Sequence, residues 1–485
     1  MLENLKPKKV MHYFEEICSI PHGSGNMEAI SAYCVDFAEK RGLKVRRDEM
    51  YNVVIVKEAS EGYEDAPTVI LQGHMDMVCE KNNDVAFDFE KEGLKLGIDG
   101  DFIYAEGTTL GGDDGIAVAM IMAILDDDTI KHPRLEAIFT TEEERGMDGA
   151  QFLDTSDLCG KYMINLDSEE EGSILTSCAG GIHSEASFDV SYTEAEGIYT
   201  KIEVKGLLGG HSGAEIHKMR ANANVLMGRI LFGLIQQLDI SVISINGGMK
   251  DNAIPREAVL ELCVPEEEMQ TLNEVLDQIA SEIKNEFKTS DPEIVVSKTF
   301  DSTVKTMSVM HMSSLQRILF VLFNAPNGIQ TMSADIPGLV ESSLNLGILR
   351  TDGDTVSLGY GVRSSVKSLR TLISDKLQYM TEMMGGIYNC EGEYPAWEYK
   401  KESSLRILAG DVFEELYGRR PGMGAIHAGL ECGLISEKIP GIDIISIGPD
   451  IYDIHTPDEK LSISSTERTY HYVVKMLEEF PKYCK

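Results

Sequence analysis

The segment Thr68-Val-Ile-Leu-Gln-Gly-His-Met-Asp76 decides the fold of this chain. Residues 68–71 have the apolar, β-branched side chains of a buried strand, and His74 and Asp76 follow where that strand would end. Four more segments end an apolar run in an acid or a histidine: Thr109-Leu-Gly-Gly-Asp-Asp-Gly115, Thr141-Glu-Glu-Glu-Arg-Gly146, Asn165-Leu-Asp-Ser168 and Ile454-His-Thr-Pro-Asp458. Two histidines and several carboxylates are the ligands that a pair of divalent metal ions with hydrolytic chemistry requires.

Strand-like and helix-like segments alternate through the first third of the chain. Strands are expected over residues 52–56, 68–71, 135–140 and 162–166, and helices over about 27–38 and 115–125. Asp113 or Asp114 is placed to cap the second helix. The alternation predicts an α/β domain with a largely parallel sheet. Ligands of such sheets bind beyond the carboxyl ends of the strands, where the histidines and acids lie.

The pattern changes after the small-residue stretch 177–183, and a length of 485 residues favours two domains. Residues 185–400 combine strands at 197–204 and 258–264, amphipathic helices at 220–238, 266–287 and 365–384, and a hairpin near 351–354. They predict an α+β domain inserted into the first, with two halves that suggest an internal duplication. Residues 1–184 and 401–485 would then form the two parts of the catalytic domain.

Composition excludes several classes of partner. The net charge of -36 argues against binding to nucleic acid and to anionic membrane surfaces. The N-terminus lacks a secretory apolar segment, and the longest apolar run, 116–125, is too short to span a bilayer. Nine cysteines without C-x-x-C spacing indicate neither a disulfide framework nor a cysteine zinc site. We expect a cytoplasmic protein.

The residues themselves leave some roles open. His74 and Asp76 lie two apart on extended chain, so Asp76 could accept a hydrogen bond from the ring nitrogen that His74 does not use on a metal. Asp113 could bridge two metals or only cap a helix. Within Glu142-Glu-Glu144, one acid could bind metal while its neighbour takes a proton from water, or the run could be a solvated loop. Asp167 is interpreted as a ligand.

The inserted region supplies further polar groups. His211 lies between glycines in Gly209-Gly-His-Ser-Gly213, where it could donate a hydrogen bond to a substrate oxyanion or belong to a flexible turn. Asn252 and Arg363 are additional candidates, and arginine is the natural partner of a substrate carboxylate.

In combination, the motifs G-H-M-D-M-V, T-T-L-G-G-D-D-G, N-L-D-S-E-E-E-G, G-G-H-S-G, N-A-I-P-R-E-A, H-A-G-L-E-C-G and H-T-P-D-E resemble those of the aminoacyl-histidine dipeptidases. These carnosinase-like enzymes (Xaa-His dipeptidases) belong to the co-catalytic di-zinc metallopeptidases. The resemblance runs from about residue 17 to the last helix. It implies a mostly parallel-sheet di-zinc peptidase domain with an inserted lid.

The resemblance also assigns roles. It implies that His74 and His455 are the terminal ligands, one per metal, and that Asp113 bridges. Glu144 and Asp167 would complete the ligand set, Glu143 would be the general base, Asp76 would orient His74, and His211 would stabilise the oxyanion from the same chain or from a partner subunit. His427 and Glu431 would lie near the substrate, with Glu431 on its amino group or imidazole. Arg145 stands where a small residue is expected, and Asp114 where asparagine is common.

The implied activity is hydrolysis of dipeptides with a free amino terminus, preferring Xaa-His and including β-Ala-His. A water between two divalent ions would attack the peptide after losing its proton to Glu143. Zinc is expected, with cobalt or manganese as alternatives. An N-acyl amino acid deacylase or a tripeptidase could use the same centre, and a non-catalytic metal or peptide binder is a remoter alternative. A homodimer is a further expectation.

Overall fold

The computed structural model describes residues 1–485 and divides into two compact units. Unit 1 comprises Met1–Cys178, Tyr399–Ala425 and Leu430–Lys485. Unit 2 comprises Ala179–Glu398 and the short return Ile426–Gly429. The boundaries thus fall a few residues before those expected at 184 and 400, because Gly180 and Gly181 already belong to a strand of unit 2.

Unit 1 is built on an eight-stranded sheet. In spatial order its strands are β1 (Lys44–Arg47), β2 (Val53–Lys57), β6 (Leu135–Thr140), β3 (Val69–His74), β7 (Tyr162–Asn165), β21 (Asp443–Ser446), β8 (Ser173–Cys178) and β20 (Gly422–Ile426). The four central strands, β6, β3, β7 and β21, are parallel, whereas β1, β2 and β8 pair antiparallel with their neighbours. The sheet is therefore mixed, and the parallel part is the part that positions the site.

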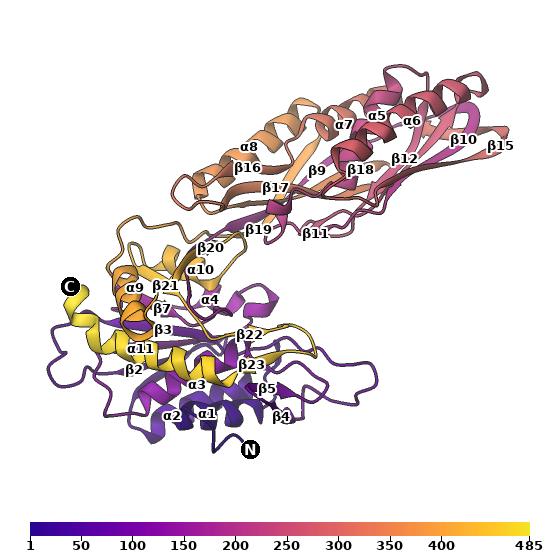
Figure 1. Ribbon diagram of the computed structural model, residues 1–485. Coiled ribbons are helices and arrows are strands. Elements are labelled where there is room, and N and C mark those ends of the chain that lie inside the picture. The colour runs from indigo at the N-terminus through magenta and orange to yellow at the C-terminus, as the bar shows by residue number, and fades with distance from the viewer. The chain divides into compact units, whose positions relative to one another are not determined.

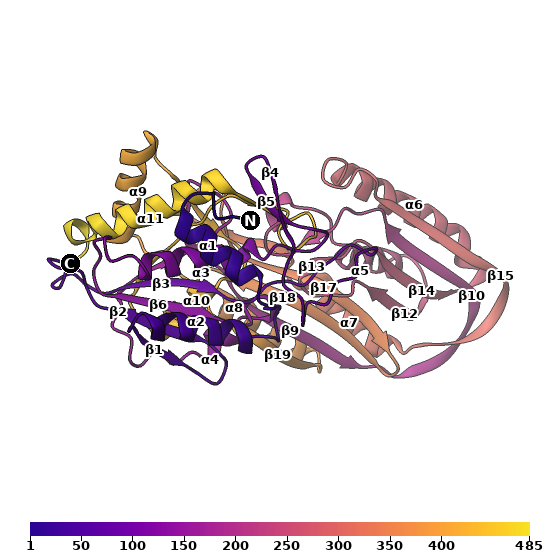
Figure 2. The same cartoon turned by 90° about the horizontal axis from the view of Figure 1, so that it is seen from below.

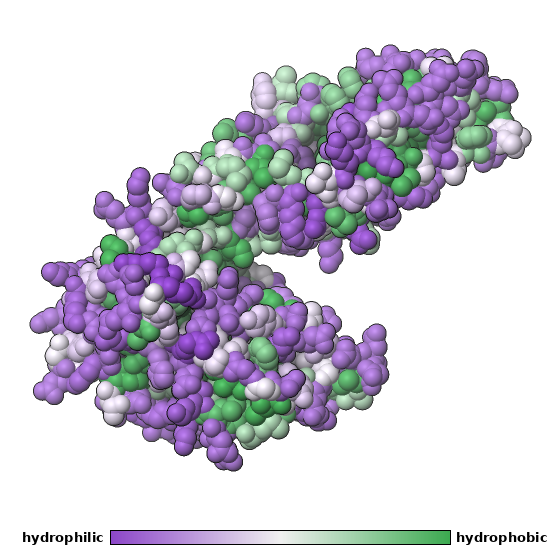
Figure 3. Space-filling view, viewed as in Figure 1, coloured by the Kyte–Doolittle hydropathy of each residue, from purple (hydrophilic) through white to green (hydrophobic).

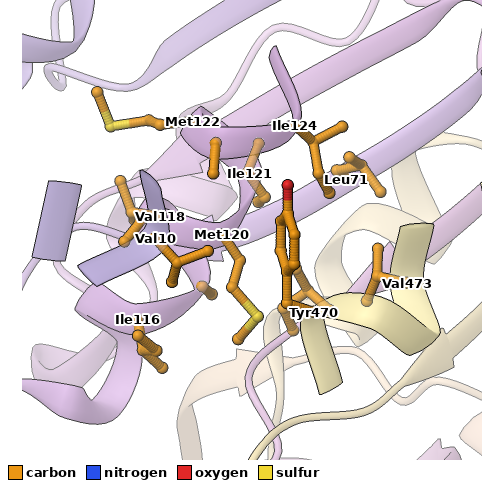
Figure 4. Packing of buried hydrophobic residues seen from close by; sticks show 14 of the residues in the cluster. Val10, Leu71, Ile116, Val118, Met120, Ile121, Met122, Ile124, Tyr470 and Val473 are labelled. Atoms are coloured by element: carbon orange, nitrogen blue, oxygen red, sulfur yellow. The ribbon is translucent and has the colours of Figure 1, made fainter. Parts of the chain in front are cut away.

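Helices supply the core around this sheet. They are α1 (Lys8–Cys18), α2 (Glu28–Lys40), α3 (Gly112–Leu125), α4 (Asp148–Phe152), α9 (Ser404–Tyr417), α10 (Glu431–Lys438) and α11 (Ile463–Tyr483). Every residue of α3 is buried, and its residues 116–125 form one continuous apolar run that is apolar on every side of the helix. Figure 4 shows its Met120 and Ile121 among Val10 of α1 and Tyr470 of α11. This packing holds the first turn of α3 in a fixed place.

A small four-stranded sheet completes unit 1, in the order β22 (Ile451–Tyr452), β23 (Lys460–Ser462), β5 (Phe102–Ala105) and β4 (Leu96–Asp99). The loop between β22 and β23 contains His455. Because β23 pairs with β5 over Lys460–Ser462, this loop is anchored at its C-terminal end.

Unit 2 has a nine-stranded antiparallel sheet. Its main order is β15 (Val295–Met310), β10 (Tyr192–Lys205), β14 (Ala258–Val264), β12 (Ser241–Gly247), β17 (Val340–Asp352), β18 (Thr355–Ser364), β9 (Gly180–Asp189) and β19 (Ile387–Tyr394), and β16 (Gly328–Met332) pairs with β17. Helices α5 (Ala223–Ile235), α6 (Met269–Glu286), α7 (Met312–Asn324) and α8 (Lys367–Met383) lie on one face (Figure 1). Figure 2 shows β10, β12, β14 and β15 side by side.

The two halves of the unit 2 sheet repeat one order of elements. Along the chain the first half runs β10, α5, β12, β14, α6, β15, and the second runs α7, β17, β18, α8, β19 and uses β9 as its remaining strand. Read inward from each edge, the sheet gives β15, β10, β14, β12 and β19, β9, β18, β17. This symmetry supports the duplication, which stays a prediction about the origin of the domain.

The predicted fold class, an α/β domain with an inserted α+β domain, is confirmed. No helix is both long enough and apolar enough to cross a membrane. All nine cysteines are free. In Figure 3 the visible surface of each unit is mostly hydrophilic, which agrees with the high net charge.

Candidate metal centre and substrate-binding groups

Parallel strands bring three of the predicted ligands to one edge of the unit 1 sheet. His74 is the last residue of β3, Glu144 lies in the short helix η1 (Glu143–Arg145) after β6, and Asp167 follows β7. Since β3 pairs in parallel with both β6 and β7, their carboxyl ends coincide. Side chains 93 residues apart in sequence therefore meet.

The other two predicted ligands come from outside the sheet. Asp113 lies near the start of α3, at a kink where its own backbone (φ −82°, ψ 103°) is not helical, two residues after Gly111, which adopts the left-handed conformation with φ of 66°. His455 lies in the β22–β23 loop, itself with φ of 60°. The prediction that Asp113 or Asp114 caps α3 is wrong: the cap is Gly111, and the nearby amides donate to Glu459 instead.

The two oxygens of Asp113 face different partners. Oδ1 lies 3.2 Å from His74 Nε2, which is also 3.6 Å from Asp167 Oδ1. Oδ2 lies 3.3 Å from His455 Nε2, which is 3.0 Å from Glu144 Oε1. Asp113 thus stands between two sets of donors, each with one imidazole and one further carboxylate.

Charges in this cluster compensate one another. Burial disfavours the charged form of His74, but the Asp113 and Asp167 carboxylates raise its pKa well above the usual value. Contacts with Asp113 and Glu144 raise the pKa of His455 to about 10. Burial raises the pKa of Asp167 to about 6, whereas His455 and His74 hold the pKa of Asp113 well below its usual range despite burial. The clustered carboxylates thus stabilise positive charge, which the protonated imidazoles of His74 and His455 supply.

The donor set fits divalent metal ions. The His74 ring donates from Nδ1 to the Asp76 carbonyl oxygen at 2.9 Å, so Nε2 is the ring nitrogen that faces the carboxylates and would bind a metal ion after losing its hydrogen. Glu144 Oε1 is buried without a hydrogen bond of acceptable geometry. Ligand atoms of His74, Asp113 and Glu144 lie within 4.8 Å of one another, as do those of His74, Asp114 and Asp167. Asp114 is the less suited ligand because its Oδ2 accepts the His74 backbone N–H at 3.2 Å and burial raises its pKa well above the usual value.

Asp76 departs from its expected contact. Its carboxylate lies 3.6 Å from His74 Nδ1, beyond hydrogen-bond distance, and the backbone carbonyl takes the ring hydrogen. The carboxylate instead accepts the backbone N–H groups of Glu143 at 3.0 Å and Glu144 at 3.2 Å, and the hydroxyl of Ser24 at 2.8 Å. Asp76 therefore ties the loop after β6 to the end of β3.

Two further acids lie beside the ligands. Burial, with the charges of Asp167, Glu431 and Glu144, raises the pKa of Glu143 well above the usual value, although the charge of His74 opposes this. Glu431 is fully buried, accepts hydrogen bonds from Gln72 and Thr140 at 2.6 Å each, and has a free Oε1. Burial raises its pKa to about 8. Glu143 is thus a group with a raised proton affinity next to the predicted centre.

In unit 2, His211 lies in a short strand and Asn252 lies in the turn directly before the neighbouring strand. A two-stranded ribbon pairs β11 (Gly210–His211) with β13 (Ala253–Ile254), and the Ser212 N–H donates to the Asn252 carbonyl at 2.8 Å. His211 Nδ1 accepts the N–H groups of Gly213 at 3.2 Å and Ala214 at 3.0 Å. Burial and the charge of Arg363 lower the His211 pKa. The neutral ring therefore carries its hydrogen on Nε2 and can donate it.

Arg363 and His427 form a second group in unit 2. Arg363 donates from a terminal nitrogen to the Tyr394 hydroxyl at 2.6 Å, and its buried Nε has no hydrogen-bond partner. His427 Nε2 lies 2.7 Å from the Ser343 hydroxyl. Burial, with Arg363 and His211, lowers the His427 pKa to about 3, so this ring stays neutral. The group carries one net positive charge, on Arg363.

One residue of the centre had no role in the sequence interpretation. Glu459, the last residue of the H-T-P-D-E motif, is 2% exposed and accepts backbone N–H groups of the Asp113 loop. A signal was present, because a glycine pair before a helix exposes amides that need an acceptor. Sequence spacing alone cannot show that an acid about 350 residues later provides it.

Comparisons with known proteins agree with this geometry. The profile of peptidase family M20/M25/M40 matches residues 70–479. The chain is 36% identical over 482 residues to the cytosol non-specific dipeptidase of Escherichia coli strain K12, covering 99% of each chain. The crystal structure of aminoacylhistidine dipeptidase from Vibrio alginolyticus superposes with a TM-score of 0.94 at 38% identity, covering 99% of this chain and 98% of that one.

A more distant structure, aminopeptidase PepT from Bacillus cereus, shares the fold with a TM-score of 0.57 at 16% identity, covering 98% of this chain and 99% of that one. The profile match spans well over half of the chain, and the E. coli relative is similar along its whole length. With a cluster of histidines and carboxylates suited to metal at its strand ends, this chain belongs to peptidase family M20/M25/M40 and is a hydrolase.

Proposed function

We propose that this peptidase is a metal-dependent dipeptidase that acts on dipeptides with a free amino terminus and prefers Xaa-His, including β-Ala-His. The observation that carries the proposal is Asp113, whose two oxygens face two imidazoles that each have a second carboxylate partner. Two relatives that match nearly the full length are named cytosol non-specific dipeptidase and aminoacylhistidine dipeptidase.

His74, Asp167 and one oxygen of Asp113 would hold one divalent ion, and His455, Glu144 and the other oxygen would hold the second. Zinc suits this mixture of imidazole and carboxylate, and cobalt or manganese would also fit. Bound ions would supply Lewis acidity and lower the pKa of a water molecule. Three carboxylates against two divalent ions leave a positive centre, which favours a developing oxyanion.

Glu143 is proposed as the general base. Its burial and the surrounding carboxylates raise its pKa, so it holds a proton more readily than a solvated glutamate. It would take the proton of the attacking water and return it to the leaving amine. Asp76 supports this role because it fixes the backbone N–H groups of both Glu143 and Glu144.

The groups of unit 2 are proposed to bind and polarise the substrate. His211 would donate from Nε2 to the oxyanion, which its tautomer permits. Arg363 would pair with the substrate carboxylate through its partnerless Nε and adjacent nitrogens. Asn252 and the neutral His427 would supply further polar contacts. Glu431 would accept the amino group or imidazole through its free Oε1.

Three proposals accompany the activity. The name of the E. coli relative supports a cytoplasmic location. A homodimer is proposed from family resemblance, and sedimentation would test it. Arg145 and Asp114, the two departures from the family pattern, would tune metal preference. Arg145 is exposed, with a guanidinium nitrogen close to Gly25, whereas Asp114 is buried against His74.

The test is product formation by purified protein reconstituted with zinc, manganese or cobalt in turn. The substrates are Ala-His, β-Ala-His, Ala-Ala, a tripeptide and N-acetyl-methionine. Metal-dependent release of histidine from the two histidine dipeptides, with the last two substrates untouched, is the expected result. Cleavage of the acetylated substrate or the tripeptide alone would replace the proposal with a deacylase or tripeptidase. Dipeptide binding without turnover would indicate a binder.

A further inference from the structure

We infer that Glu459 is a positioning residue for the metal centre: its buried carboxylate fixes the backbone that carries Asp113 and joins it to the loop that carries His455. The inference rests on the proposed function, because it concerns how two of the proposed ligands, Asp113 and His455, are held in position relative to each other. Glu459 would touch neither metal nor substrate.

The carboxylate accepts four consecutive backbone N–H groups. Oε2 lies 2.7 Å from the nitrogen of Leu110 and 3.1 Å from that of Gly111. Oε1 lies 2.8 Å from the nitrogen of Gly112 and 3.4 Å from that of Asp113 itself. The first turn of a helix leaves its N–H groups without internal partners, and converging amides of this kind form an anion site. Glu459 fills that site from the other end of the chain.

The fit is close on the backbone side as well. A methyl group added at Gly112 would lie 3.2 Å from Glu459 Oε1, tighter than ordinary contact. Gly111 has φ of 66°, a conformation that glycine adopts without strain. The two glycines therefore let the backbone wrap around the carboxylate, which explains why both precede Asp113.

Glu459 is equally fixed from its own side. Its backbone N–H donates to the Thr456 carbonyl at 3.1 Å, and it directly precedes β23, which pairs with β5. Thr456 follows His455, so Glu459 connects the β22–β23 loop that carries His455 to the backbone that carries Asp113. A shift of Glu459 would move Asp113 relative to His455, whose Nε2 is 3.3 Å from Asp113 Oδ2.

A glutamate is required rather than a polar residue of the same size. In Glu459→Gln the side-chain amide turns an N–H₂ group toward two backbone donors, so at most half of the four hydrogen bonds survive. We expect metal affinity to fall about tenfold or more, the effect typical of residues that orient metal ligands.

The experiment titrates metal-free protein with Co²⁺ and follows visible absorption, metal content and thermal unfolding of the metal-free form. The matched control is Glu136→Gln. Glu136 is also fully buried in unit 1, accepts the Cys159 and Gly160 N–H groups, and lies near the amino end of β6, away from the ligands. We expect the altered cobalt spectrum and weakened binding only in Glu459→Gln, with partial recovery in Glu459→Asp, which keeps the charge.

A wild-type cobalt spectrum and affinity in folded Glu459→Gln would overturn the inference, as would an equal change in the Glu136 control. If Glu459→Gln does not fold, Gly112→Ala decides, because it displaces the carboxylate by only a few tenths of an ångström. An unchanged cobalt spectrum in that variant would also overturn it. Wild-type protein that binds no cobalt would instead refute the proposed metal centre, and the inference with it.

Discussion

The sheets of the two units differ in what lies on their faces. In unit 1, every residue of β3 and β6 is buried, so polar groups along these strands must find partners inside the protein. In unit 2, residues 258–262 of β14 alternate between buried and partly exposed, and helices lie on one face of the sheet only. Polar side chains on the unit 1 strands are therefore surrounded by protein, whereas the unit 2 sheet leaves one face without helices.

The polar groups of each unit reflect this difference. Asp76 and Glu459 of unit 1 are 1% and 2% exposed and use both carboxylate oxygens inside the protein. In unit 2, His211 Nε2 and Arg363 Nε keep hydrogen-bonding capacity unused. We expect substitutions in unit 1 to destroy the centre or its chemistry, and substitutions in unit 2 to weaken transition-state and substrate binding while the metal stays bound.

The largest effect is expected from Asp113→Ala. It removes both oxygens that face the two imidazoles, so neither ion keeps its full ligand set, and activity should fall to background. Metal content after dialysis is the measurement. Two ions still bound per chain would contradict the bridging role of Asp113. It would also contradict the expectation that substitutions in unit 1, unlike those in unit 2, disrupt the metal centre.

Next in size is Glu143→Ala, which should retain both metals while kcat falls by about 10²- to 10⁴-fold, the usual contribution of a general base. The matched control is Glu142→Ala, because Glu142 is the adjacent acid and its carboxylate accepts the Gly25 N–H. Steady-state kinetics with parallel metal analysis measures both variants. Near wild-type turnover in Glu143→Ala, or an equal loss in the control, would refute the assignment.

In unit 2, His211→Ala should reduce kcat by about 10²- to 10³-fold, as loss of one oxyanion donor does, without loss of metal. His217, an exposed histidine six residues later, provides the control, and His217→Ala should leave kcat unchanged. Loss of metal in His211→Ala would contradict the expectation that substitutions in unit 2 leave metal binding intact. Unchanged kcat would show that this histidine does not donate to the transition state.

The smallest effect is expected from Arg363→Lys. Lysine keeps the positive charge but not the planar, paired donors, so KM should rise about tenfold while kcat changes little. Initial rates across dipeptide concentrations separate the two constants. A fall in kcat with constant KM would show that Arg363 stabilises the transition state and not the bound substrate.

Local pattern was enough to predict much of unit 1. The strand expected at 135–140 is β6 residue for residue, and the apolar run of 116–125 lies in α3. The meeting of His74, Glu144 and Asp167 followed from one rule, that parallel strands end at the same edge, whereas the roles of Asp113 and His455 came from the family resemblance. Both results depend on neighbours in sequence or on sheet topology, which alternating segments reveal.

Hydrogen bonds for which several acceptors compete in the folded protein could not be predicted from the sequence. Asp76 was expected to bind the His74 ring, but the carbonyl oxygen of the same residue is nearer and leaves its carboxylate for the amides of Glu143 and Glu144. Likewise the amides of the Asp113 loop are bound by Glu459, and the short return Ile426–Gly429 to unit 2 has no sequence signal.

The insertion of unit 2 has a consequence for synthesis on the ribosome. When residues 1–398 have emerged, unit 2 lacks only its four-residue return, whereas β7 and β8 still lack β21, the strand that separates them in the sheet. His455 and Glu459 emerge later still. The unit that is second along the chain can therefore fold first, and a polypeptide cut short before the β22–β23 loop would lack His455, one of the proposed metal ligands.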